Sequence, residues 1–91
     1  MDIIESLVAF LDALINQPEC NSSFINRILK PANKNVDADY AINCFALKSF
    51  FNMNGDQIAT ELKQRITPEI LKIYPFIETI FIEGAYFNIK L

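Results

Sequence analysis

Residues 76–91 read FIETIFIEGAYFNIKL, and this stretch carries the clearest fold signal in the chain. It is apolar and β-branched up to residue 82, turns at residues 83–85, and then alternates strictly between apolar and polar side chains. Alternate side chains of a strand point to opposite faces of a sheet. One face of the last strand holds Phe87, Ile89 and Leu91, and the other holds Tyr86, Asn88 and Lys90. The stretch predicts a β-hairpin with one apolar face.

Helical spacing of apolar residues dominates the segments before this hairpin. The pattern predicts a first helix over residues 3–15, which Asp2 can cap. It predicts a second helix over residues 42–53, with Gly55 as its stop. A third helix follows over residues 58–66.

Polar residues mark the starts of the later helices. Asn54 or Asp56 can cap the helix over residues 58–66. Thr67 can cap one more short helical turn, in which Pro68 takes the first position. Asn43 is better explained as a cap of the second helix than as a ligand contact.

Two further strands are predicted between the first two helices. Residues 24–29 (FINRIL) are short and rich in β-forming residues, which favours a strand. Residues 31–37 are a polar loop, and residues 38–40 can pair briefly as an edge strand. The order helix, strand pair, helices, strand pair predicts one α+β domain over residues 1–91, a two-layer sandwich.

Composition excludes several function classes. The 91 residues carry 8 basic and 11 acidic side chains, a formal net charge of −3, and no histidine. Sequence-blind nucleic-acid binding needs many cations, so a general clamp on DNA or RNA is disfavoured. Without histidine there is no histidine-based general base and no histidine zinc site.

Other composition features concern the compartment. The separation of Cys20 and Cys44 fits no metal-ligand pair, and free thiols are favoured over a disulfide. The first residues are acidic, unlike a secretory signal, and every apolar run is far shorter than the ~20 residues that cross a bilayer. We therefore expect a cytoplasmic protein with no membrane partner.

No group of residues predicts catalysis. Asp37 and Asp39 share one strand face at most, and a role in shaping the loop is favoured over acid–base work. The chain has only Gly55 and Gly84, so it has no glycine-rich phosphate loop. We expect no catalytic residue, no metal site and no cofactor in these 91 residues.

The polar face of the last strand has two interpretations. The Tyr86 ring could stack on an unstacked base, the Asn88 amide could bond the base edge, and the Lys90 ammonium could contact a phosphate. A solvated outer face on a half-buried strand has the same pattern and, taken alone, is favoured.

Three ordered segments resemble one known family. Residues 39–43 (DYAIN), 54–62 (NGDQIATEL) and 84–91 (GAYFNIKL) are similar to three motifs of the N-terminal additional domain of arginyl-tRNA synthetases. The resemblance runs from about Asp39 to Leu91, whereas the first helix fits by position and pattern only. Ala38 and Gly55 depart from the glycine and proline that are usual in the family.

The resemblance implies a fold and a role. The fold is α-β-β-α-β-β, with an antiparallel sheet and helices on one face. The role is contact with the D-loop, at the outer corner of tRNA(Arg), through an aromatic and an amide on the last strand. These positions match Tyr86 and Asn88. To them we add Lys90 as a phosphate contact, because it shares their face.

The resemblance also implies partners and leaves one alternative open. The class I catalytic domain, which binds ATP, is expected after Leu91, so this segment is not expected to aminoacylate by itself. With its negative charge, the segment should bind tRNA weakly unless it is tethered to that domain. The alternative is a free-standing protein-interaction module that uses the acidic first helix or the sheet edge.

Overall fold

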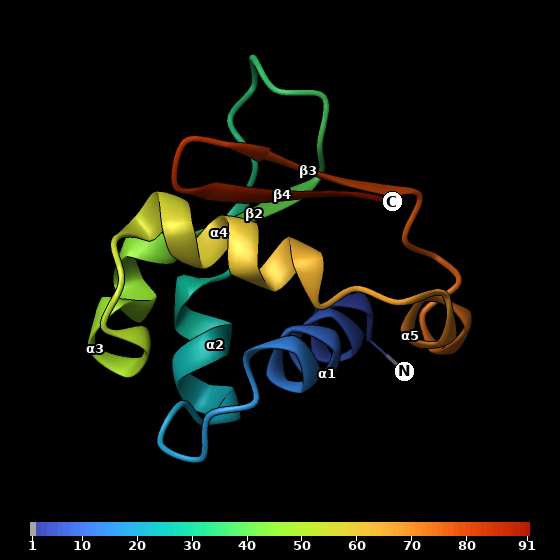
Figure 1. Ribbon diagram of the computed structural model, residues 1–91. Coiled ribbons are helices and arrows are strands. Elements are labelled where there is room, and N and C mark those ends of the chain that lie inside the picture. The colour runs from blue at the N-terminus through green and yellow to red at the C-terminus, as the bar shows by residue number, and fades with distance from the viewer. Residues whose placement is uncertain (1) are drawn as a thin grey trace.

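A four-stranded antiparallel sheet forms one layer of the structure, and helices cover one of its faces (Figure 1). The computed structural model describes residues 2–91. The strands are β1 (Lys30–Pro31), β2 (Tyr40–Asn43), β3 (Thr79–Glu83) and β4 (Tyr86–Lys90), in the spatial order β1-β2-β4-β3. The predicted two-layer α+β fold with helices on one face is confirmed.

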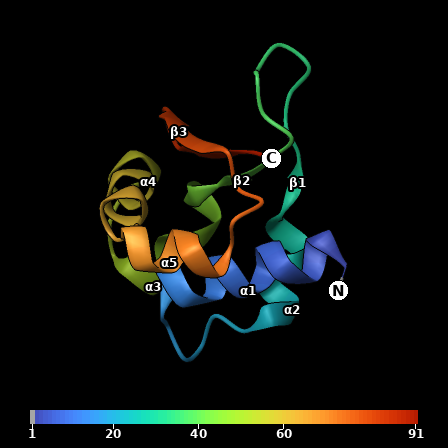
Figure 2. The same cartoon turned by 90° about the vertical axis from the view of Figure 1, so that its right-hand side faces the viewer.

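The described residues form more helices than the sequence predicts, although the first helix has the predicted bounds. They are α1 (Ile3–Ile15), α2 (Ser22–Ile28), the 3₁₀ helix η1 (Cys44–Leu47), α3 (Lys48–Phe51), α4 (Gly55–Gln64) and α5 (Pro68–Ile73). Figure 2 shows α1, α2 and α5 in the layer below the sheet and the β1–β2 loop above it. Within residues 2–91 no helix has both the length and the apolar character needed to cross a membrane.

The first helix supplies more of the buried core residues than any other described element. Asp2 caps α1 by accepting a hydrogen bond from the Ile4 amide at 3.2 Å, and Asn16 ends it in the left-handed conformation. The buried side of α1 faces the apolar side chains of the sheet. Its fully or almost fully buried residues are Leu7, Val8, Phe10, Leu11, Leu14 and Ile15. Phe87 and Ile89 of β4 belong to the same core.

Residues 24–28 are helical and Leu29 caps that helix, so the strand predicted over residues 24–29 is wrong. Asn21 caps α2 by accepting a hydrogen bond from the Phe24 amide at 2.9 Å. Ile25 is buried in the core, and Leu29 lies four residues later, also buried. The β-forming side chains are thus used at helical spacing, because packing against α1 outweighs a weak local preference.

The second predicted strand and the helix after it are both displaced. The strand occupies Tyr40–Asn43 instead of residues 38–40, and helical structure begins at Cys44 instead of Ile42. Asn43 caps η1, as predicted, by accepting a hydrogen bond from the Phe45 amide at 3.1 Å.

Gly55 begins a helix and does not end one, which corrects a second prediction. It is the first residue of α4, and Asn54 caps that helix through a capping box with Gln57. A Cβ atom on Gly55 would lie 2.7 Å from the Cβ of Ala85 and 3.1 Å from the Phe45 amide nitrogen. Glycine therefore allows α4 to approach the β3–β4 turn closely. Thr67 and Pro68 begin α5 as predicted.

The hairpin at residues 79–90 fixes the register of the sheet. Glu83 pairs with Tyr86, and Gly84 has a φ of 61°, the left-handed conformation that a tight turn requires. On its other side β4 pairs with β2, with Asn43 opposite Tyr86. β4 is therefore a central strand of the sheet.

Candidate functional site

The face of the sheet opposite the helices holds the polar residues of β4. Side chains of directly paired residues on neighbouring strands lie on the same face of a sheet, so the strand register identifies the neighbours of each β4 side chain. Tyr86 lies between Asn43 of β2 and Glu83 of β3. Asn88 lies between Ala41 of β2 and Phe81 of β3.

Tyr86 is exposed, as the alternation predicts. Its residue is 51% exposed, one of the largest values among the big apolar and aromatic residues described. The strand holds the ring on the open face of the sheet, beside two polar neighbours. An exposed aromatic ring in this position can stack on another flat ring.

Asn88 lies on the predicted face, but it is buried and not solvated. Its residue is only 2% exposed, and its Nδ2 atom has no hydrogen-bond partner within residues 2–91. A buried amide group without a partner costs free energy, and few native side chains are left in this state. The Asn88 amide can therefore donate a hydrogen bond to a bound group.

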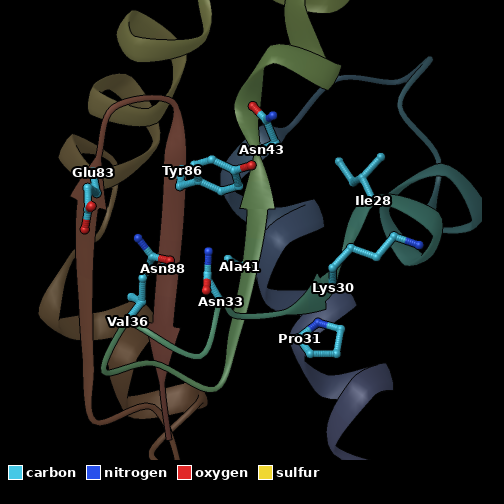
Figure 3. A pocket seen from close by; sticks show the side chains of 10 residues that line it. All are labelled: Ile28, Lys30, Pro31, Asn33, Val36, Ala41, Asn43, Glu83, Tyr86 and Asn88. Atoms are coloured by element: carbon cyan, nitrogen blue, oxygen red, sulfur yellow. The ribbon is translucent and has the colours of Figure 1, made fainter.

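A cavity of about 440 Å³ opens beside these two residues. Its walls come from α2, all four strands and the β1–β2 loop, and its lining includes Tyr86, Asn88, Asn43, Lys30 and Glu83. Figure 3 shows Asn33 and Val36 of the loop close to Asn88. Tyr86 lies two residues from Asn88 along β4. The cavity offers an aromatic surface, amide groups and charges of both signs.

Lys90 is predicted to contact a phosphate, but in the structure it is bound to a carboxylate. Its Nζ atom donates a hydrogen bond to Asp37 Oδ2 at 2.8 Å. Hydrogen bonding to Asp37 and the negative charge of the same carboxylate raise the pKa of Lys90, and the charges of Glu78 and Asp39 add to the effect. Lys90 is therefore a paired cation on the rim of the same face.

The neighbouring aspartate holds the end of β4. Asp39 Oδ2 accepts a hydrogen bond from the Leu91 amide at 2.7 Å, and the Asp39 amide donates to the Ile89 carbonyl oxygen at 2.9 Å. The loop-shaping role predicted for Asp37 and Asp39 agrees with these contacts.

Both cysteines are free and buried, and burial raises the pKa of the Cys44 thiol to about 12.

The sequence alone does not identify the other residues of this site. Asn43 and Glu83 are recognisable only once the strand register is known, since they come from β2 and β3. The β1–β2 loop folds back over the sheet (Figure 3) and brings Asn33 and Val36 to the cavity, whereas Lys30 comes from β1. If residues 40–43 are paired with residues 86–89 as antiparallel strands, Asn43 falls opposite Tyr86, and this pairing is a signal by which the sequence could have identified Asn43.

A comparison with known families shows to which family the chain belongs. The family described as "Arginyl tRNA synthetase N terminal domain" matches residues 2–91, which is nearly the whole chain. The chain belongs to this family. A search of curated proteins and a search of solved structures gave no match.

The family match extends the resemblance seen in the sequence. The sequence motifs begin at about Asp39, whereas the family match over residues 2–91 also covers α1 and α2. The domain family is part of an aminoacyl-tRNA synthetase, which is consistent with tRNA and a catalytic domain as partners. Within this domain, the open face of the sheet carries the exposed tyrosine and the unpaired amide.

Proposed function

We propose that this arginyl-tRNA synthetase N-terminal domain binds the D-loop of tRNA(Arg) through the open face of its sheet. Tyr86 stacks on one unstacked base, Asn88 donates a hydrogen bond to the edge of that base, and Lys90 contacts a neighbouring phosphate. Catalysis and ATP binding are assigned to another part of the synthetase, which this domain assists by holding the tRNA.

The unpaired amide of Asn88 is the observation that carries this proposal. A buried Nδ2 atom on the wall of a cavity needs an acceptor, and base edges offer carbonyl and ring-nitrogen acceptors. Tyr86, two residues away on the same face, supplies the surface on which a base can lie.

Charge sets the strength expected of this contact. The net charge of −3 repels RNA, and the cation of Lys90 is already paired. We expect the 91 residues alone to bind with a dissociation constant weaker than about 10⁻⁴ M, the weak end of ordinary non-specific binding. Tethering to a catalytic domain that also holds the tRNA would raise the effective concentration enough to make the contact useful.

The test maps the binding face by NMR. The ¹⁵N-labelled chain is titrated with an RNA hairpin that carries the D-arm of tRNA(Arg), and separately with an anticodon-arm hairpin of equal length. The D-arm hairpin should shift the resonances of Tyr86 and the side-chain amide of Asn88, and the anticodon-arm hairpin should not. Equal shifts with both hairpins, or shifts confined to α1 or to the β3 edge, would contradict the proposal. The second pattern would favour a protein-interaction module.

A further inference from the structure

The loop between β1 and β2 lies on the open face of the sheet, beside the amide that the proposed function requires (Figure 3). At its base, the Ala32 amide donates to the Asp39 carbonyl oxygen at 3.1 Å. Beyond this bond, residues 33–36 turn back on themselves, with the Val36 amide donating to the Asn33 carbonyl oxygen at 3.0 Å. Asn33 and Val36 line the cavity with Asn88 (Figure 3). Residues of the loop thus lie beside the almost fully buried Asn88 in the free domain.

Two side-chain bonds tie this loop to the last strand: Asp39 binds the Leu91 amide at the end of β4, and Asp37, nearer the loop tip, binds Lys90. Asp37 Oδ2 and Lys90 Nζ lie 2.8 Å apart and are separated by 53 residues in the sequence. The Asp37 side chain is 85% exposed. Ion pairs with such exposure are weak and readily exchanged for other partners, because water and salt screen them.

We propose that Asp37 occupies the position of a tRNA phosphate on Lys90, and that exchange of the carboxylate for a phosphate releases the loop from Asn88. This inference rests on the proposed function and adds its regulation. Carboxylate and phosphate oxygens accept the same charge-assisted hydrogen bond from an ammonium group, so they compete for Lys90. A phosphate that binds there removes the contact that holds residues 33–37 closed.

The exchange accounts for two features together. It explains why Lys90, the cation on the same strand face as Tyr86 and Asn88, is neutralised within the chain. It also explains how a base could reach an amide that is 2% exposed in the free domain. RNA without a phosphate at Lys90 would leave the loop closed, so the loop favours ligands that fill both positions.

Glu78 provides a matched control for the charge. Its carboxylate is near enough to Lys90 to raise the pKa of that group, but it makes no side-chain hydrogen bond with it. Asp37→Asn and Glu78→Gln therefore remove the same charge from the same neighbourhood. Only Asp37→Asn weakens the tie between the loop and β4.

The first experiment uses no RNA and measures hydrogen exchange of the Asn88 side-chain amide by NMR. Asp37→Asn should accelerate this exchange by about twofold to fivefold, the range expected from losing a surface ion pair. Glu78→Gln should leave it unchanged. Equal exchange rates in the parent chain and Asp37→Asn would overturn the proposed closure.

The second experiment measures the affinity of each variant for the D-arm hairpin. Asp37→Asn should tighten binding about twofold to fivefold more than Glu78→Gln does. In a Lys90→Gln background, Asp37→Asn should have no more effect than Glu78→Gln. Equal gains from the two carboxylate variants in the parent background would overturn the competition for Lys90. A hairpin that shifts no resonance on this face contradicts the proposed function, whereas the exchange measurement still decides whether the loop is held by Asp37.

Discussion

The guanidinium group of Arg65 binds the main-chain carbonyl oxygen of Leu14 at 2.8 Å and thereby joins the ends of α4 and α1. The same Nη1 atom also donates to the Ile15 carbonyl oxygen at 3.1 Å. The last carbonyl groups of a helix have no partner within that helix, so a side chain that binds them stabilises its end. Arg65 also lies over the ring of Phe51, with 5.3 Å between the guanidinium carbon and the ring centroid. This contact holds the helical layer together beneath the sheet.

Removal of this contact should destabilise the domain without affecting RNA binding. Arg65→Met keeps much of the apolar stem, and we expect the free energy of unfolding to fall by about 2 kcal/mol, the size of a charge-assisted hydrogen bond. Glu61→Gln removes only the charge of the half-buried i,i+4 partner at 2.9 Å, and should cost about 0.5 kcal/mol or less. Urea denaturation measures both. Equal losses in the two variants would contradict the role given to the Leu14 carbonyl.

The close approach of Gly55 and Ala85 predicts a rescue. Gly55→Ala places a Cβ 2.7 Å from the Cβ of Ala85, and overpacking of this kind costs about 1–3 kcal/mol. In the double variant Gly55→Ala, Ala85→Gly, the obstructing methyl group is gone, and part of the loss should be recovered. Thermal or urea unfolding of the four proteins gives the coupling free energy. Additive effects would show that the two positions do not interact.

The unpaired amide of Asn88 predicts opposite effects on stability and binding. Asn88→Leu replaces an unsatisfied buried group by an apolar one of similar shape, so the free energy of unfolding should rise by about 1 kcal/mol. Binding of the D-arm hairpin should weaken at the same time. Asn43→Leu is the control on the same face: its amide oxygen caps η1, and its loss should destabilise by about 1 kcal/mol. A destabilised Asn88→Leu would mean that the Asn88 amide already has its partners.

The buried thiol of Cys44 predicts how stability depends on alkaline pH. Burial raises its pKa from the ordinary value of 9.0 to about 12, so the folded chain keeps the proton that the unfolded chain loses. The resulting stabilisation is complete below pH 9 and is lost as the pH rises toward 12. The free energy of unfolding should therefore fall more steeply over this range in the parent chain than in Cys44→Ala. Parallel pH profiles would contradict this reading of the thiol.

The sequence predicts the layers of this domain better than it predicts its site. The strict alternation of residues 86–91 identifies the face of each side chain, because that property depends on strand geometry alone. The strand predicted at residues 24–29 fails because Ile25 and Leu29 serve the core at helical spacing. Their spacing and the cap at Asn21 are the signals that indicate a helix.

The site depends on contacts between distant segments. Alternation places Asn88 on the outer face, but it is buried there and shares a cavity with residues of a loop whose path over the sheet no local pattern describes. The partner of Lys90 is 53 residues away, so its pairing with Asp37 cannot be obtained from periodicity. Family resemblance selects Tyr86 and Asn88 as site residues, whereas the structure adds that Tyr86 is exposed and Asn88 is buried.

The most direct test of the account is the affinity of three variants for the D-arm hairpin, measured by NMR titration. Tyr86→Ala should weaken binding about tenfold, the loss expected when a base can no longer stack on an aromatic ring. Tyr86→Phe retains the ring and should stay within about twofold of the parent chain. Phe45→Ala removes an aromatic residue that is 62% exposed but does not line the cavity, and should have no effect. If Tyr86→Ala binds the hairpin as tightly as the parent chain, the open face of the sheet is not where this domain holds tRNA.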